Sequence, residues 1–186
     1  MLHNEIPILD KRDYFRGIVS QFALDKKPNF DGLNENLRFV CKTGCYYSVD
    51  EFISKLDAAL SAGKYDVAIV DSLSSFVYCN FSDHAAVANL FCKFNELKSK
   101  HNFAMVLIHH FDKPMFWSKR LHPAKWCMGG KAIGVYANIM SALVGTKEES
   151  VFSFRHYKPF EDSEISQTLI AQCQNGNTAW GEVENV

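Results

Sequence analysis

Three features of this sequence predict an α/β protein built on a mostly parallel sheet flanked by helices. Apolar runs typical of buried strands alternate along the chain with amphipathic helical patterns. The 186 residues suit one domain with a substantial core, and 47% of them are hydrophobic. The six cysteines are scattered without paired zinc spacing, so the sequence predicts free thiols in an ordinary core.

The first elements follow from local patterns. Residues 1–4 are expected to end a strand before Glu5, residues 9–24 have apolar positions at helical spacing, and residues 37–41 form a short strand. Ser48 and Glu51 match a capping box, in which each side chain bonds the other residue's backbone amide. The helix that they start has one apolar face and ends at Gly63; that face consists of Phe52, Leu56 and Leu60.

The central elements are two buried strands separated by a helix. The strands are predicted at 65–71 and 103–108, each an apolar run followed by polar residues. Asp83 is the expected cap of the intervening helix, whose apolar residues recur at the helical period: Val87, Leu90, Phe91, Phe94 and Leu97. A short helix within 129–136 and strands at 138–144, 151–157 and 165–172 complete the chain, as an antiparallel extension of the sheet.

Charge and hydropathy exclude some functions. The formal net charge of −1 gives no overall attraction to nucleic acid, so such binding needs a local basic patch or an assembled ring. The N-terminus has no signal-peptide pattern, and no apolar run approaches the ~18 residues that span a bilayer. A cytoplasmic protein without a membrane partner is expected.

Four residues follow directly after predicted strands, where ligands collect in a parallel α/β sheet: Glu5, Asp71, His110 and Lys158. The carboxylate of Asp71 suits Mg²⁺ held through its water shell. The alternative is that Asp71 only caps the next turn.

The adjacent histidines at the end of the second buried strand have two interpretations. His110 could donate a hydrogen bond to a phosphate, or the pair could be one buried histidine with an exposed neighbour. A metal site formed with Asp112 and Asp71 is a further alternative. Adjacent strand residues point to opposite faces, however, which disfavours joint ligation by His109 and His110.

Three segments in the same order and spacing resemble the RepA-type hexameric helicase ATPases of the RecA-like superfamily. They are Asp66–Phe76, Phe103–Lys113 and Gly129–Ile133. The resemblance implies a single RecA-like ATPase core over 1–186 that uses ATP and Mg²⁺ and self-associates.

The resemblance also implies roles for single residues. Asp71 and Ser72 would form a Walker B site for the Mg²⁺ and nucleotide, and His110 a phosphate sensor. Glu5 would polarise the attacking water, and Lys158 would reach the nucleotide of a neighbouring subunit.

The sequence departs from this family in having no G-x-x-x-x-G-K-S/T phosphate loop. We expect the strand leading into that loop to be missing, and ATP binding by the isolated chain to be weak or absent. The strand over 103–108 should then have an open edge. Either the strand over 138–144 moves in beside it, or a second chain covers the edge.

Residues 111–128 are predicted to be a mobile loop that combines positive charge with aromatic rings: Lys113, Lys119, Arg120, Lys125, Trp117 and Trp126. Basic groups can hold phosphates while rings stack on bases, so single-stranded DNA is a candidate partner. A tryptophan-anchored surface lid is the alternative.

Two other functions compete with the ATPase: a non-catalytic nucleic-acid-binding or assembly module, and an unrelated α/β hydrolytic enzyme using Asp71 and the histidines.

Overall fold

The structure is a computed structural model of the chain, and its described residues are 2–3, 38, 40–41, 46–111, 127–128, 132–145, 151–158, 161–174 and 177–182. Internal contacts divide the chain into two compact units. The first comprises Met1–Arg12 and Pro28–His110, and the second comprises Asp13–Lys27 and Phe111–Val186.

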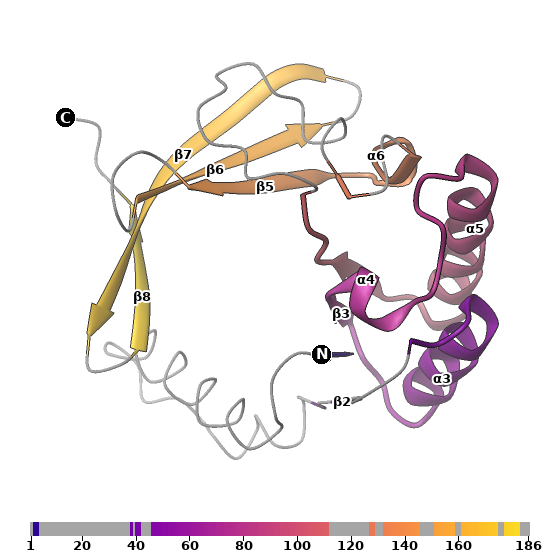
Figure 1. Ribbon diagram of the computed structural model, residues 1–186. Helices are drawn as coiled ribbons and strands as arrows, with labels where there is room; N and C mark the ends of the chain where they lie inside the picture. Colours follow the sequence, from indigo (N-terminus) through magenta and orange to yellow (C-terminus); the bar gives the residue numbers. More distant parts are fainter. Residues whose placement is uncertain are drawn as a thin grey trace. The chain divides into compact units, whose positions relative to one another are not determined.

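The first unit contains the predicted parallel sheet (Figure 1). Its order is β2-β1-β3-β4, and each neighbouring pair is parallel. The strands are β1 (Leu2–His3), β2 (Val40–Cys41), β3 (Val67–Asp71) and β4 (Ala104–Leu107). This arrangement confirms the predicted parallel α/β class.

Helix α3 (Val49–Ser61) begins and ends as its sequence predicts. The Glu51 N–H donates to Ser48 Oγ at 3.3 Å, and the Ser48 N–H donates to Glu51 Oε2 at 2.9 Å, which completes the capping box. Gly63 follows the last turn. A Cβ at Gly63 would lie 2.9 Å from the outer atoms of the Tyr65 side chain, so a larger residue at this position requires that side chain to shift.

Helix α5 (His84–His101) runs beside α3 (Figure 1). The Asp83 carboxylate accepts hydrogen bonds from the Ala85 and Ala86 N–H groups, as an N-cap aspartate does. Asn102 ends the helix in the left-handed conformation, with φ of 51°. All five residues predicted for its apolar face are buried: Val87, Leu90, Phe91, Phe94 and Leu97.

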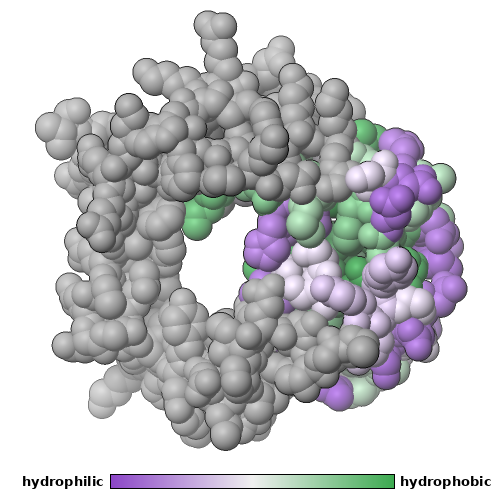
Figure 2. Space-filling view, viewed as in Figure 1, coloured by the Kyte–Doolittle hydropathy of each residue, from purple (hydrophilic) through white to green (hydrophobic). Residues whose placement is uncertain are grey.

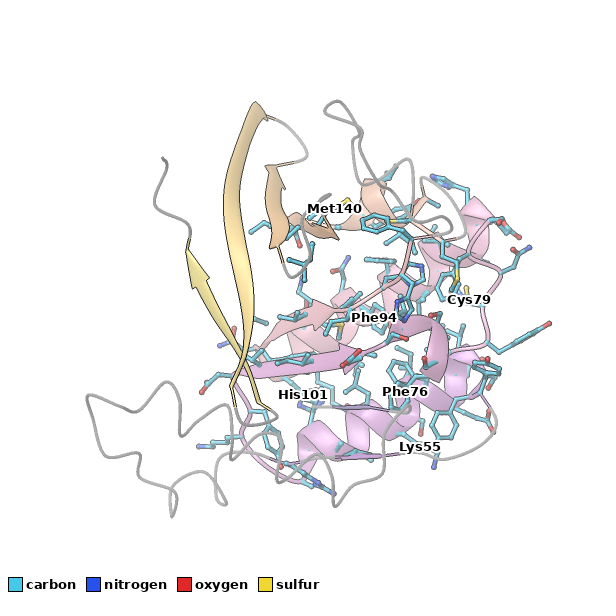
Figure 3. The ribbon with its side chains drawn as sticks, turned by 60° about the vertical axis from the view of Figure 1, so that its left-hand side comes forward. Lys55, Phe76, Cys79, Phe94, His101 and Met140 are labelled. Carbon is cyan, nitrogen blue, oxygen red and sulfur yellow. The ribbon has the colours of Figure 1, made fainter. Side chains whose placement is uncertain are left out.

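Aromatic rings from three helices form the centre of this unit's core. The Phe52 ring on α3 lies 6.0 Å from the Phe76 ring and 6.2 Å from the Phe94 ring, and all three are almost fully buried. Phe76 belongs to α4 (Leu73–Phe76), a short helix that the sequence did not predict, and Figure 3 labels it with Phe94 of α5. Hydrophilic residues cover much of the outer surface in Figure 2, with apolar residues between them.

The second unit contains an antiparallel sheet of order β5-β6-β7-β8. It confirms the predicted C-terminal antiparallel strands and adds a fourth that the sequence analysis missed. The strands are β5 (Met140–Gly145), β6 (Val151–Lys158), β7 (Glu161–Gln174) and β8 (Asn177–Glu182), preceded by α6 (Ala132–Tyr136).

The expectation that the strand over 138–144 moves in beside β4 is wrong. That segment forms β5, which pairs with β6 in the other sheet. The cause is that β6 offers β5 a continuous antiparallel register from Met140↔Tyr157 to Gly145↔Phe152. Among the described strands, β4 pairs with β3 alone.

Candidate functional site

The candidate site lies where β3 and β4 end. The two strands pair in parallel, from Val67↔Ala104 to Val70↔Leu107, and the Ile108 N–H donates to the Val70 carbonyl oxygen at 2.9 Å. Asp71 and His110 therefore follow neighbouring strands at the same edge of the sheet. His3 of β1 pairs with Asp71 from the other side, so β1 also ends at this edge.

Alternation along the strands places Asp71 and His110 on one face. Ala68, Val70 and Ser72 are buried at 9%, 0% and 0% exposure, whereas Val67 is 50% exposed and Asp71 is half-buried. On β4 and just after it, Val106 and Ile108 are 46% and 37% exposed, and His110 is exposed. We call the side with Asp71, Ile108 and His110 the open face of the sheet.

The turn after Asp71 is fixed to the end of β4 by the backbone. The Leu73 N–H, the first of α4, donates to the Ile108 carbonyl oxygen at 2.8 Å. Ser72 is fully buried, and its Oγ lies 2.6 Å from Ser75 Oγ and 3.4 Å from Ser74 Oγ. The Asp71–Ser72 peptide bond is cis. These contacts hold the Asp71 backbone against the strand that ends at the two histidines.

The two histidines have different surroundings. The His109 ring packs 5.1 Å from the ring of Phe81, which is buried, at an interplanar angle of 55°. His110 is exposed on the open face. His109 is half-buried and packs on Phe81, whereas His110 is exposed, so His110 is the one of the two that can meet a ligand.

A metal centre built from these histidines has no support in the part of the chain that the structure describes. No group of three His, Cys, Asp or Glu side chains there could hold a metal ion. Asp112, one of the residues considered for it, lies outside the described residues.

Several predicted site residues also lie outside the described part of the chain. They are Glu5 and the loop residues Lys113, Trp117, Lys119, Arg120, Lys125 and Trp126. Lys158 is the last residue of β6, in the second unit, and the structure describes its backbone but not its side chain.

Sequence reasoning missed two supports of the site. One is α4, whose four residues are too few to show a helical period. The other is Phe81, which packs on His109 from the segment before α5. Its only local signal is an apolar residue two positions before the Asp83 cap, and nothing in that signal identifies a partner near His109.

The described residues fit part of a magnesium–nucleotide site. A half-buried carboxylate at Asp71 beside an exposed imidazole at His110 suits a hydrated Mg²⁺ and a phosphate oxygen. The Leu73 N–H, the first amide of α4, is not available to a phosphate, because it already donates to the Ile108 carbonyl oxygen. The described residues therefore fit the metal side of such a site and do not supply its phosphate loop.

A small apolar hollow lies elsewhere in this unit, between β2, α3 and the start of β3. Leu56, Leu60 and Val67 line it, with Arg38 and Tyr65 as its polar members. It contains neither Asp71 nor His110, because it meets β3 at the opposite end.

In the part of the chain that is described, no helix combines the length and the apolar character needed to cross a membrane.

Comparison with solved structures gives the class of this fold. The chain is similar to a KaiC-like protein from the hyperthermophilic archaeon Pyrococcus horikoshii OT3, with a TM-score of 0.56 and 11% identity over 97% of this chain and 74% of that one. It is also similar to a DnaB-like replicative helicase that interacts with primase, with a TM-score of 0.54 and 13% identity. That match covers 95% of this chain and 49% of the helicase, so the chain spans about half of the helicase's length. These two likenesses show the fold, which is the RecA-like α/β fold that the sequence resemblance implied.

Residues 15–115, more than half of the 186, match the family model described as an AAA domain, and the chain belongs to this family. A search of curated proteins finds no match.

Proposed function

We propose that this chain is the NTPase core of a helicase-type replication protein of a plasmid, phage or mobile element, and that its phosphate loop comes from outside these 186 residues. The observation that carries the proposal is the placement of Asp71 and His110 on one face at the ends of adjacent parallel strands. That pairing suits a metal-bound phosphate, which needs a carboxylate for the hydrated ion and a donor for a phosphate oxygen.

Each candidate residue has a role in this proposal. Asp71 accepts hydrogen bonds from water on Mg²⁺, next to the buried Ser72, and His110 donates to a phosphate oxygen. Glu5 orients the attacking water, and Lys158 serves the nucleotide of a neighbouring copy in an oligomer. ATP is the nucleotide that family membership favours.

The proposal predicts that the isolated chain binds ATP weakly or not at all. The missing amides and lysine supply most of the phosphate-binding free energy in such folds, and Asp71 with His110 cannot replace them. Calorimetric titration of the chain with ATP and Mg²⁺ checks this, with Asp71→Asn as the matched variant. Low-micromolar ATP binding that Asp71→Asn abolishes would contradict the need for an external phosphate loop.

A second candidate function is a non-catalytic nucleic-acid-binding or assembly module with the same fold. The absence of a G-x-x-x-x-G-K-S/T pattern from the 186 residues favours it. The basic and aromatic residues of 111–128 are its contact with single-stranded DNA. Adding a phosphate loop to the chain distinguishes the two candidate functions. The NTPase core then binds ATP, whereas the non-catalytic module does not.

A further inference from the structure

The apolar hollow of the first unit lies away from the sheet edge that carries Asp71. Its lining residues come from β2, α3 and the start of β3, and its volume of about 390 Å³ is partly open to solvent. Leu56 and Leu60, both buried, line it from α3, and Val67, which is 50% exposed, lines it from β3. A concave surface that is mostly apolar, with a few polar groups, is typical of sites for small ligands.

The walls of the hollow are held by contacts within the unit. Val67 pairs with Ala104 of β4 in the parallel sheet. The outer atoms of the Tyr65 side chain lie against Gly63, close to where a Cβ would be. Leu56 belongs to the buried face of α3. Because packed elements form the hollow, it is present before any ligand binds.

Two alanines leave the space of the hollow open. Ala59 on α3 and Ala68 on β3 both line it, next to larger side chains of the same elements. A bulkier side chain at either position would occupy the space. Ala68 is buried, whereas Ala59 is half-buried, so Ala59 is the position at which the hollow can be filled with less disturbance of the core.

The polar groups of the hollow define the charge of its ligand. Among the described residues that line it, Arg38 alone carries a charge and Tyr65 alone has a hydroxyl group. Arg38 is exposed, and a guanidinium group has five N–H donors, so it can bind a carboxylate and keep other contacts. A cation would be repelled by Arg38 without a lining carboxylate to compensate. The hollow therefore favours an anion with an apolar body.

We infer that this hollow binds a small carboxylic acid with an aromatic or branched aliphatic body. The apolar body lies against α3 and Val67, and the carboxylate accepts hydrogen bonds from Arg38. Burial of apolar surface supplies most of the affinity, because water and salt screen an exposed guanidinium group. The site is independent of the proposed function, since the hollow contains neither Asp71 nor His110.

Titration of the 186-residue chain with phenylacetate, followed by NMR of its methyl groups, tests the inference. The signals of Leu56, Leu60 and Val67 should shift and saturate, with a dissociation constant on the order of a millimolar, which is ordinary for so small a ligand. Phenylacetamide has the same body without the charge and should bind about threefold or more weakly at low salt. Shifts that do not saturate would overturn the inference, and so would equal binding of the two probes.

Two variants test the site by different means. Ala59→Leu fills the hollow and should abolish the ligand-induced shift of Val67, whereas Ala58→Leu, at an exposed position of α3 outside the hollow, should retain it. Arg38→Gln removes the charge and should make phenylacetate and phenylacetamide bind equally. Arg38 is exposed, so this variant still tests the inference if Ala59→Leu does not fold by circular dichroism. Binding of phenylacetate that neither variant changes would contradict the assigned site.

Dilution of the protein provides the control for self-association. In the absence of a ligand, the methyl signals of Leu56 and Val67 should stay unchanged when the chain is diluted. Signals that change on dilution, together with a sedimentation mass that falls toward the monomer, would mean that a second copy of the chain fills the hollow. That result would overturn its assignment to a small acid.

Discussion

At the scale of single residues, Asp57 makes polar contacts that join α3 to α5. Its carboxylate accepts from Lys100 Nζ at 2.8 and 2.9 Å, and its Oδ1 lies 2.6 Å from His101 Nε2. Asp57 is on α3 and both partners are in the last turn of α5, so the contact joins the two helices that pack side by side; Figure 3 labels His101. Basic residues in that turn also interact favourably with the helix dipole.

We predict that Asp57→Asn lowers the thermal midpoint of unfolding at neutral pH and that this difference shrinks in acid. Hydrogen bonds from His101 and Lys100 lower the pKa of Asp57 below its ordinary value of 3.8. A carboxyl group with a lowered folded-state pKa stabilises the fold above its unfolded pKa, and that stabilisation is lost as pH falls below 3.8 through the folded pKa. Thermal melts of both proteins between neutral pH and about pH 2 measure it.

Asp50→Asn is the matched control on the same helix. Asp50 pairs with Lys93 at 3.0 Å and raises the pKa of that lysine, but the Asp50 side chain is 83% exposed. Exposed ion pairs contribute little to stability, so this variant should melt close to the parent protein. An Asp57→Asn protein that melts like the Asp50→Asn protein at every pH would show that the α3–α5 contact adds nothing.

At the scale of elements, the sequence predicted the long helices well because their signals are local. The capping box and apolar face of α3 lie within or directly beside that helix in the chain, and the same is true of the Asp83 cap and apolar face of α5. The two elements that the sequence did not predict, α4 and β8, had no such local signal. Helix α4 is too short for a period, and β8 (Asn177–Glu182) is defined by pairing with β7.

We predict that Ser48→Ala destabilises the folded chain by about 1 kcal/mol, within the range of 0.5–2 kcal/mol usual for a lost N-cap. The substitution removes the Oγ that accepts from the Glu51 N–H, and Ser48 Oγ also lies 2.8 Å from Glu51 Oε2. Ser48→Thr, which keeps both the acceptor for the Glu51 N–H and the hydroxyl that donates to Glu51 Oε2, should recover most of the loss. Chemical denaturation of the three proteins gives the comparison, and equal stability of the alanine and threonine variants would rule out capping as the cause.

At the scale of the whole molecule, the sequence predicted that the strands ending at Asp71 and at His109 lie side by side, and it failed for β5. Residues 67–70 and 104–107 are uninterrupted apolar runs, which suit neighbouring places in a parallel sheet. The partner of β5 depended on whether β6 or β4 offered the better register, and no local pattern decides that. The residues of the candidate site also differ in how well the sequence predicts them. Asp71 and His110 were predicted from strand ends, whereas Phe81 could be recognised only from the three-dimensional packing.

The whole chain has no general attraction for nucleic acid, because its net charge is −1. Single-strand binding, if it depends on residues 111–128, must come from the charges clustered there. Changing Lys113, Lys119, Arg120 and Lys125 to glutamine should weaken binding and reduce the slope of log K against log salt by about 3, at ~0.7 for each phosphate contact with a single strand. Fluorescence anisotropy of a labelled oligonucleotide at several salt concentrations measures the slope.

Lys64→Gln with Lys98→Gln is the control, because it removes lysines outside that segment and should leave the slope unchanged. A slope that is the same in the parent and the fourfold variant would remove residues 111–128 as the contact, and so would a parent protein that does not bind the oligonucleotide.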